Sequence, residues 1–314
     1  VKGIVRLLQE EGYVHLSCGD SCGVGSAKKV MEGTGMDQML EDYGVTIVDF
    51  NEGSTVSYPQ GHMAKEFFLA KPVQETDALI NLCKMKTHAL ERVTGGVKNL
   101  YGCISGLHKA KGHTKYTNAD IFARQLIDLN LLIKPRFCVM DGIVAMDGNG
   151  PTSGDPVKMK VLLLGNDPVA IDSVYCHLVH LDPQMVPTNV HGETMGLGTW
   201  REENIRLLTD GGEITMQEAV ERFGNPDFNV DRKKQRGNLW NRFNNGFLRY
   251  FQKKPYIEED KCKKCGICVE ACPVEGKALQ FKNGRRKPPV YNYHKCIRCF
   301  CCQEMCPHKA IQVK

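Results

Sequence analysis

Two short stretches near the carboxyl end, CKKCGICVEACP (262–273) and CIRCFCCQEMCP (296–307), repeat one pattern. Each has the form C-x2-C-x2-C-x3-C-P, and the second copy starts 34 residues after the first. The second copy contains five cysteines where the pattern needs four, and the extra one is Cys301, which stands at the place of Ile267. We therefore expect Cys301 to be a small apolar neighbour of a metal site and not a ligand.

The spacing of the other eight cysteines points to iron–sulfur chemistry. Three thiolates separated by two residues each let one loop hold three corners of a cube-shaped [4Fe-4S] cluster. The fourth begins a helix that points away, and the proline after it directs this cysteine to the other cluster. The predicted ligands are Cys262, Cys265, Cys268 and Cys306 for one cluster, and Cys296, Cys299, Cys302 and Cys272 for the second. Two four-cysteine zinc sites are the alternative, although those usually pair two C-x2-C units across a longer gap.

Residues 255–314 resemble bacterial dicluster ferredoxins, which are small α+β domains. One departure follows the fourth cysteine, where CPVEGKAL in the first copy is two residues longer than CPHKAI in the second. We expect this insertion to alter a turn and no ligand. A domain of this size buries little apolar area, so thiolate–iron bonds should supply much of its stability.

Cysteine usage and hydropathy indicate the cellular compartment of the protein. Nine of the fifteen cysteines lie between Cys262 and Cys306, which in a chain of 314 residues favours metal binding in a reducing compartment over a disulfide framework. The sequence shows neither a signal-peptide pattern nor an apolar run near 18 residues, so we expect a cytoplasmic location and no transmembrane segment. The chain opens at Val1 within a helical pattern, which leaves a preceding segment open.

Charge is uneven along the chain. The net charge is +5, but residues 253–314 carry 14 Lys and Arg against 6 Asp and Glu, or +8, which leaves −3 for the rest. Basic surroundings favour a reduced cluster and an acidic redox partner protein. No nucleic-acid-binding motif accompanies the basic residues, so we expect no nucleic acid partner.

The first 223 residues alternate between strand and helix patterns. Strands are predicted at 13–17, 45–50, 78–82, 136–142, 159–165 and 204–211. Helices are predicted at 26–42, 117–132 and 168–180. This alternation is typical of an α/β domain with a mostly parallel sheet covered by helices. The expected organisation is an α/β domain (1–223), a linker (224–254) and the dicluster ferredoxin-like domain (255–314).

The linker is basic and has an aromatic stripe at helical spacing. The stripe consists of Leu239, Trp240, Phe243, Phe247, Tyr250 and Phe251. We expect a connecting helix that packs this face against one of the domains, because such a stripe must be buried. A helix lying on a membrane surface is the alternative.

Polar residues gather after predicted strands and at a helix start of the α/β domain. The candidates for ligand binding are Lys84, Lys86, His88, Lys98, Asn99, Asp141 and Asp172. Ligands of parallel α/β sheets bind at the carboxyl ends of strands. The lysines and Asn99 would form a site for an anionic small molecule with a phosphate or carboxylate, and the aspartates would anchor them or bind a cation. Solvated loop charges, with Asp167 as a helix cap, are the alternative.

The stretch SCGDSCGVGSAKK (17–29) follows a predicted strand and precedes a helix, where backbone N–H groups can surround an anion. It is not a P-loop, because no G-K-[ST] follows, and Lys28 stands where a dinucleotide fingerprint has its third glycine. Cys18 and Cys22 are either a redox or metal-binding pair or small residues of a tight loop.

Four pieces of the α/β domain resemble the family called domain of unknown function 362. They are NLCKMKTH, GGVKNLYGCISGLHK, MDGIVAMDGNGPTSGDP and NDPVAIDSV. The resemblance implies an α/β fold in an iron–sulfur redox setting of anaerobic prokaryotes, and no particular reaction. Cys22 and Cys83 stand where we expect proline from the family, and we expect the N-terminal strand region of the family to be absent from this sequence.

Two functions from different classes follow. In the first, the chain is an electron-transfer protein or oxidoreductase component whose two clusters exchange electrons with a ligand or partner at the α/β domain. In the second, it is a non-enzymatic docking module whose clusters are mainly structural. The sequence contains no constellation of nucleophile and base, which argues against a hydrolase.

Overall fold

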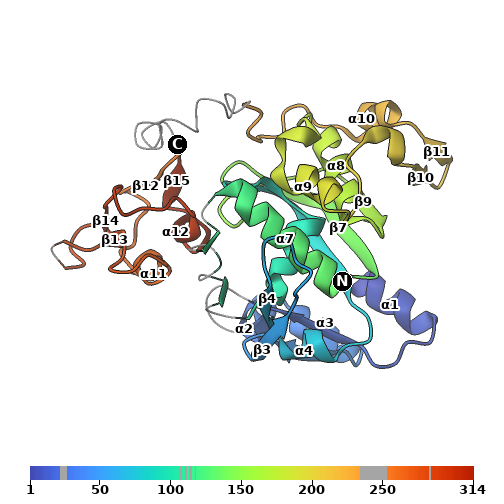
Figure 1. Ribbon diagram of the computed structural model, residues 1–314, viewed down its shortest axis with the longest axis horizontal. Coiled ribbons are helices and arrows are strands. Elements are labelled where there is room, and N and C mark those ends of the chain that lie inside the picture. Colours follow the sequence, from blue (N-terminus) through green and yellow to red (C-terminus); the bar gives the residue numbers. More distant parts are fainter. Residues whose placement is uncertain are drawn as a thin grey trace.

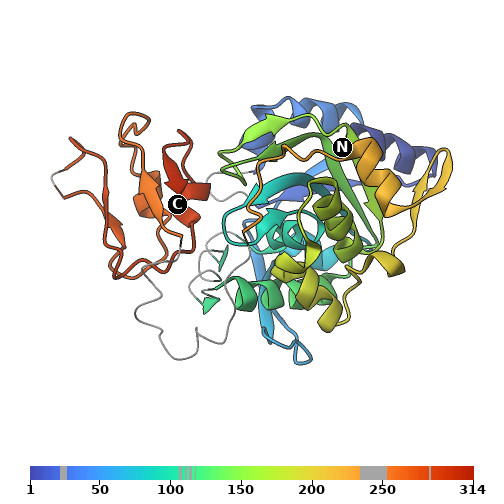
Figure 2. The ribbon, with the colours of Figure 1, turned by 90° about the horizontal axis from the view of Figure 1, so that it is seen from above.

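The protein is described here by a computed structural model that covers residues 1–21, 27–105, 108–109, 112, 115–116, 118–233, 253–282 and 284–314. An α/β domain and a small carboxyl-terminal module lie side by side (Figures 1 and 2). The predicted aromatic linker helix falls within 234–252, outside the described residues. Among the helices of the described ranges, none has the length and apolar character needed to cross a bilayer.

The centre of the α/β domain is a five-stranded sheet with the order β6-β5-β7-β8, in which β9 also pairs with β7. Its strands are β5 (Ile80–His88), β6 (Arg92–Thr94), β7 (Phe137–Asp147), β8 (Asp155–Val157) and β9 (Val161–Gly165). β5 and β7 run parallel, with Lys84 opposite Asp141, whereas β6, β8 and β9 pair antiparallel.

The prediction of a mostly parallel sheet is not confirmed for this sheet. The segments from β7 to β8 and from β8 to β9 contain no described helix, and short connections return a strand antiparallel to its neighbour. The long connection from β5 to β7 contains helices, which makes a parallel crossover feasible. The result is a mixed α/β sheet with one central parallel pair.

Helices pack on one face of this sheet. The helices of this part of the domain are α5 (Gly96–Asn99), α7 (Ala119–Ile133), α8 (Pro168–Leu178), α9 (Pro187–Thr194) and α10 (Met216–Phe223). Between them lie the 3-10 turns η1 (Leu100–Cys103), η2 (Pro183–Met185) and η3 (Glu202–Asn204) and the strand pair β10 (Leu207–Thr209) and β11 (Gly212–Ile214). Met85 and Met140 of the sheet are fully buried in one core with Tyr175 of α8. Each such side chain contributes roughly 1.5–3 kcal/mol by burial. The core continues beyond α10 through Phe228, which is also fully buried.

Helix starts explain two polar residues of the sequence. Asp167 caps α8, because its carboxylate accepts the N–H groups of Val169 and Ala170 at 2.8 and 2.9 Å. Asn118 caps α7 by accepting the N–H of Ile121 at 2.9 Å. Asp167 is therefore a helix N-cap, as the alternative to a ligand-binding role predicted.

The amino-terminal part of the domain contains two small two-stranded sheets, β1–β2 and β3–β4. Its elements are α1 (Lys2–Glu10), β1 (Ser17–Asp20), α2 (Ala27–Glu32), α3 (Met36–Asp42), β2 (Thr46–Asp49), β3 (Gly53–Ser57), β4 (Glu66–Ala70) and α4 (Lys71–Glu75). β1 begins at the residue where the predicted strand 13–17 was expected to end. The predicted helix at 26–42 is two helices, α2 and α3, separated by a turn with Gly35 in the left-handed region.

The carboxyl-terminal module consists of two strand pairs and two short helices. They are β12 (Pro255–Ile257) with β15 (Ile311–Val313), β13 (Leu279–Gln280) with β14 (Val290–Tyr291), α11 (Ile267–Glu270) and α12 (Cys301–Glu304). The two cysteine repeats have the same backbone. Gly266 and Phe300, the residues before the two helices, both have positive φ, as do Lys264 and Arg298. The sequence repeat is therefore also a structural repeat.

Candidate metal centre and docking site

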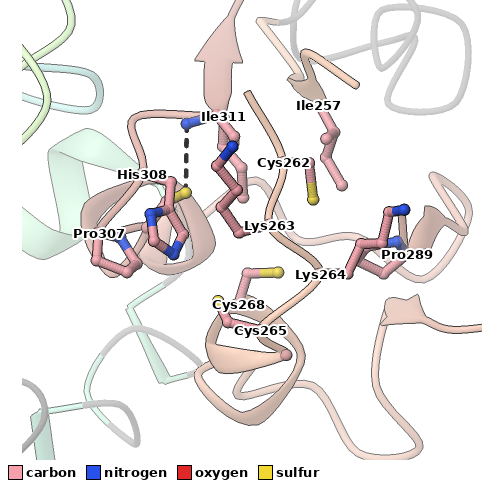
Figure 3. Close-up of a pocket in the computed structure, with 13 residues that line it drawn as sticks. Ile257, Cys262, Lys263, Lys264, Cys265, Cys268, Pro289, Pro307, His308 and Ile311 are labelled. Atoms are coloured by element: carbon pink, nitrogen blue, oxygen red, sulfur yellow. Dashed lines mark hydrogen bonds between the residues drawn. The ribbon is translucent and has the colours of Figure 1, made fainter. Parts of the chain in front are cut away.

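Cysteines line two cavities in the module. A cavity of about 340 Å³ is lined by Cys262, Cys265, Cys268 and Cys306. We call it the first cavity, and Figure 3 shows its lining residues. The second cavity, of about 310 Å³, is lined by Cys272, Cys296, Cys299 and Cys302. This grouping is the same as in the crossed ligand sets expected from the sequence, and Cys301 lines neither of these two cavities. That these cysteines hold clusters stays a prediction.

Hydrogen bonds to sulfur are equivalent in the two repeats. The N–H of Ala278 lies 3.3 Å from Sγ of Cys272, and the N–H of Ala310 lies 3.3 Å from Sγ of Cys306. The first pair is six residues apart and the second is four apart, so the two-residue insertion is absorbed in the intervening turn. One further contact has no such counterpart among the described hydrogen bonds: Tyr291 Oη lies 3.2 Å from Sγ of Cys302.

The linings of the two cavities differ in charge. Lys263, Lys264 and His308 contribute to the first cavity. The residues around the second cavity, apart from its cysteines and Tyr291, are the apolar Pro255, Pro273, Val274, Ala278, Leu279, Ile297 and Phe300. A low-dielectric surround therefore distinguishes the second cavity from the first.

The module contacts the α/β domain through the second repeat. Thr152 Oγ1 donates to the carbonyl of Glu304 at 2.7 Å, and Asn149 Nδ2 donates to the carbonyl of Ile311 at 2.9 Å. Lys309 Nζ donates to the carbonyl of Gly154 at 3.0 Å. Asn149, Thr152 and Gly154 belong to the loop that follows β7, so the module lies at the carboxyl end of that strand (Figure 1).

Gln303 is the most enclosed residue of this contact. Its side chain is fully buried, and Nε2 lies within 3.1 Å of the carbonyls of Asn149 and Gly150 and of Asn149 Oδ1. A buried amide that lost these acceptors would have an unsatisfied donor, which costs about 1–3 kcal/mol. The contact between the two domains is therefore specific in its polar groups as well as in shape.

His88, at the carboxyl end of β5, joins the same contact. Its Nδ1 accepts the N–H groups of Leu90 and Glu91 at 3.2 and 3.0 Å, so the proton of the neutral ring sits on Nε2. Nε2 donates to a carboxylate oxygen of Glu304 at 2.9 Å. Complete burial lowers the pKa of His88, and Lys98 lowers it further, while Glu304 opposes both effects. The ring is a neutral donor toward the module.

The predicted lysines lie near one another beside this contact. Lys84 pairs with Asp141 at 2.7 Å, and both side chains are about 40% exposed. Lys86 is on the same face of β5, half-buried. Burial lowers the pKa of Lys86, and the nearby charge of Lys98 lowers it further. The positive charges of Lys98 and Lys84 both lower the pKa of Lys86, which indicates a positive potential at Lys86.

Asn99 and Asp172 are engaged with the protein. Asn99 Nδ2 donates to Asn81 Oδ1 at 2.8 Å and to the carbonyl of Leu82 at 3.1 Å. The buried carboxylate of Asp172 accepts the N–H groups of Gly96 and Val97 at 2.6 and 3.1 Å. Burial raises the pKa of Asp172 to about 7, against the lowering effect of these two bonds. Asp172 thus supports the start of α5. The ion-pair partner of Lys84 is Asp141 instead.

Three cysteines of the α/β domain that the sequence analysis considered are Cys18, Cys22 and Cys83. Cys18 lies in β1, and burial raises the pKa of its thiol. Cys22 and most of the loop after it fall within 22–26, outside the described residues, so the proposed pairing of these cysteines stays a prediction. Cys83, predicted to be a core residue, is buried with Sγ 3.9 Å from that of Cys138.

Glu91 is a buried acidic residue with a raised pKa, and it was not singled out from the sequence. Its side chain is fully buried, and neither carboxylate oxygen has a hydrogen-bond partner among the residues that the structure describes. Burial raises its pKa to about 8, opposed by Lys98. Gln303, Thr152 and Asn149 were also missed, because a domain contact leaves no motif in the sequence of either partner.

Comparison with known proteins agrees with this architecture. The family described as domain of unknown function (DUF362) matches residues 1–177, and a 4Fe-4S dicluster domain matches residues 254–307. The chain is 36% identical over 219 residues to the thylakoid-associated protein sll1697 of Synechocystis sp.. The aligned stretch covers 69% of this chain and 67% of the relative. The chain therefore belongs to the DUF362 family and carries a 4Fe-4S dicluster domain after it.

Proposed function

We propose that this protein passes single electrons between an external redox partner and an anionic ligand at the α/β domain, through two [4Fe-4S] clusters. One observation carries the proposal. The module with the two cysteine-lined cavities sits on the carboxyl ends of β5 and β7, where α/β sheets hold their ligands.

The spacing of the cysteines supports clusters over single zinc ions. Four-cysteine zinc sites usually pair two C-x2-C units across a longer gap. Three cysteines of one repeat and the fourth of the other line each cavity, as crossed ligation of two cube-shaped clusters requires. When bound, such clusters accept and release one electron each.

The residues of this chain have separate roles in the proposal. The crossed cysteine sets would hold the clusters, and the N–H groups of Ala278 and Ala310 would stabilise the added negative charge on sulfur. Lys86 and Lys98 would hold a phosphate or carboxylate of the ligand, and Lys84 would be released from Asp141 for the same purpose. His88 would connect the ligand side to the module.

The setting of the proposal follows from charge and resemblance. The basic module suits an acidic redox partner. A cytoplasmic location and an anaerobic host stay predictions, since the relative in Synechocystis is described as thylakoid-associated.

The test starts with anaerobic purification. We expect about eight irons per chain and the electron paramagnetic resonance spectrum of two reduced [4Fe-4S] clusters after dithionite. A colourless protein that contains zinc would refute the electron-transfer proposal.

Ligand binding is tested separately with pyrophosphate and citrate as probes in calorimetry. We expect the double variant Lys86→Gln and Lys98→Gln to weaken binding at least about tenfold. The matched control is Lys134→Gln with Arg136→Gln, whose exposed side chains lie before the start of β7. Intact clusters without any anion binding would favour the alternative of a non-enzymatic docking module.

A further inference from the structure

The two repeats of the module differ in what surrounds them. Of the described hydrogen bonds between the α/β domain and residues 262–311, all come from positions 303–311. The equivalent positions of the first repeat are Val269 for Gln303 and Glu270 for Glu304. Glu270 is exposed, whereas Gln303 is fully buried. The second repeat thus docks on the α/β domain, and within the described residues the equivalent positions of the first repeat form no such hydrogen bond.

The face that carries the first repeat is basic. Between residues 261 and 287 the chain has eight Lys and Arg and two Glu. Lys263 and Lys264 line the first cavity between two of its cysteines. Arg285 reaches the same loop, because its guanidinium would lie 3.0 Å from a Cβ placed on Gly266. Arg286 and Lys287 follow it, and all three are exposed.

The local carboxylates offset this face only in part, because residues 258–287 contain eight Lys and Arg against five acidic residues, Glu258, Glu259, Asp260, Glu270 and Glu275. Glu258 forms an ion pair with Lys261 at 2.6 Å, which leaves Lys263 and Lys264 for other contacts. Glu270 and Glu275 are the two carboxylates within 261–287. β13 and β14, which flank the arginines, lie on the side of the module away from the α/β domain in Figure 1. Lys263 and Lys264 therefore stand at the wall of the first cavity, and the segment that carries the arginines lies on the outward side of the module.

We propose that this face, formed by Lys263, Lys264, Arg285, Arg286 and Lys287, docks an acidic one-electron carrier protein at the first cavity. The inference rests on the proposed function and adds the surface and the direction. A [4Fe-4S] cluster held by the cysteines of the first cavity would accept the one electron that the reduced carrier gives up, with no proton or bond exchanged. The second repeat, which is docked on the α/β domain, would hold the second cluster beside that domain. Opposite charges on two redox proteins speed their encounter and set its orientation.

The test uses the cluster-loaded full chain and a small acidic [2Fe-2S] ferredoxin as the probe. Binding is measured by calorimetry with both proteins oxidised, and electron delivery by stopped-flow absorbance with the ferredoxin reduced. The variant is Arg285→Glu with Arg286→Glu, both of which lie outside the two cysteine repeats at 262–273 and 296–307. The control is Lys134→Glu with Arg136→Glu, which changes the net charge equally at exposed positions before β7.

We expect the arginine variant to weaken binding and slow electron delivery at least about tenfold at low salt, and to lose most of the salt dependence. The control should behave like the wild type, and all three proteins should keep their iron and their reduction by dithionite. Equal losses in both variants, or unchanged binding in the arginine variant, would overturn the inference while the proposed function stands.

Anionic phospholipid vesicles provide a second probe. If the arginine variant loses vesicle binding but receives electrons from the ferredoxin as the wild type does, the face is a membrane contact and the inference is wrong. Absence of iron from the wild type would refute the proposed function itself, which separates the two failures.

Discussion

The first and second cysteine repeats share one backbone but have different neighbours. Both place a short helix after a residue with positive φ, and both bond a backbone N–H to their fourth cysteine at 3.3 Å. The second repeat is buried against the α/β domain through Gln303, whereas the first leaves Glu270 exposed. The spacing of the cysteines thus sets the backbone of the loop, and the side chains between the cysteines decide what the loop contacts.

Single cysteine substitutions test this comparison with the largest expected effect. Cys302→Ala and Cys272→Ala should each reduce iron from about eight to about four per chain and remove the same cluster signal. This follows because both residues line the second cavity although they belong to different repeats. Iron analysis and electron paramagnetic resonance provide the measurement.

Cys301→Ala is the matched control, because Cys301 is buried next to these residues and lines neither of the two cavities. It should keep all its iron. Retention of the second cluster in Cys272→Ala, with loss of the first, would show that the ligand sets are not crossed.

The docked side should also respond to pH through Glu91. Its pKa of about 8 lies above the unfolded value of about 4.3, so the folded protein binds a proton that the unfolded chain releases. This stabilisation is complete below the unfolded pKa and is lost as the pH rises through 8. The free energy of unfolding should therefore fall by about 2 kcal/mol between pH 6 and 8.

Glu91→Gln should abolish most of that pH dependence, as measured by urea unfolding of the cluster-loaded protein at several pH values. Glu270→Gln, at the exposed helix end of the first repeat, is the control and should keep the wild-type slope. An unchanged slope in Glu91→Gln would mean that Glu91 is ionised in the folded protein.

Gln303→Ala asks whether the docking contact depends on one buried amide. Removing its hydrogen bonds should raise hydrogen exchange of the loop at Asn149 and Gly150 about tenfold, since one such loss costs about 1–2 kcal/mol. Val269→Ala at the equivalent position should leave the exchange of this loop unchanged. If both variants exchange as the wild type does, the two domains are held together by other contacts.

The smallest expected effect is on the reduction potential of the cluster predicted at the second cavity. Tyr291 bonds the sulfur of Cys302, and a donor to a thiolate stabilises the reduced cluster. Tyr291→Phe should lower the potential of the second-cavity cluster by about 40 mV, equivalent to a bond of about 1 kcal/mol for one electron. Redox titration followed by electron paramagnetic resonance should show the first-cavity cluster unchanged, and a shift of both clusters would contradict a local bond.

Much of the α/β fold was predictable from residue pattern. The strands predicted at 136–142 and 159–165 overlap β7 and β9, and the helix predicted at 168–180 overlaps α8. Their apolar residues are spaced so that one face of each is buried, a local property that the sequence displays directly. The antiparallel pairing of β9 was not predicted, because pairing direction depends on the connection and not on the strand itself.

The candidate site shows the same division. The sequence predicted a strand at 78–82 with Lys84 and Lys86 after it, whereas both residues lie within β5 (Ile80–His88) and share one of its faces, since strand side chains alternate. It did not show that Asp172 supports α5 from the core, 2.6 Å from the N–H of Gly96, because that contact joins residues 76 positions apart. The distant partner decides whether a carboxylate is a ligand or a structural acceptor.

The sequence alone determined the cysteine repeats, because cluster ligation depends on short, fixed spacing within each loop. It also determined the charge imbalance between the module and the rest of the chain. Tertiary structure alone decided that His88 meets Glu304 and that the second repeat, rather than the first, faces the α/β domain. Such contacts join residues 216 positions apart, and only packing and hydrogen bonding across the folded surfaces select them.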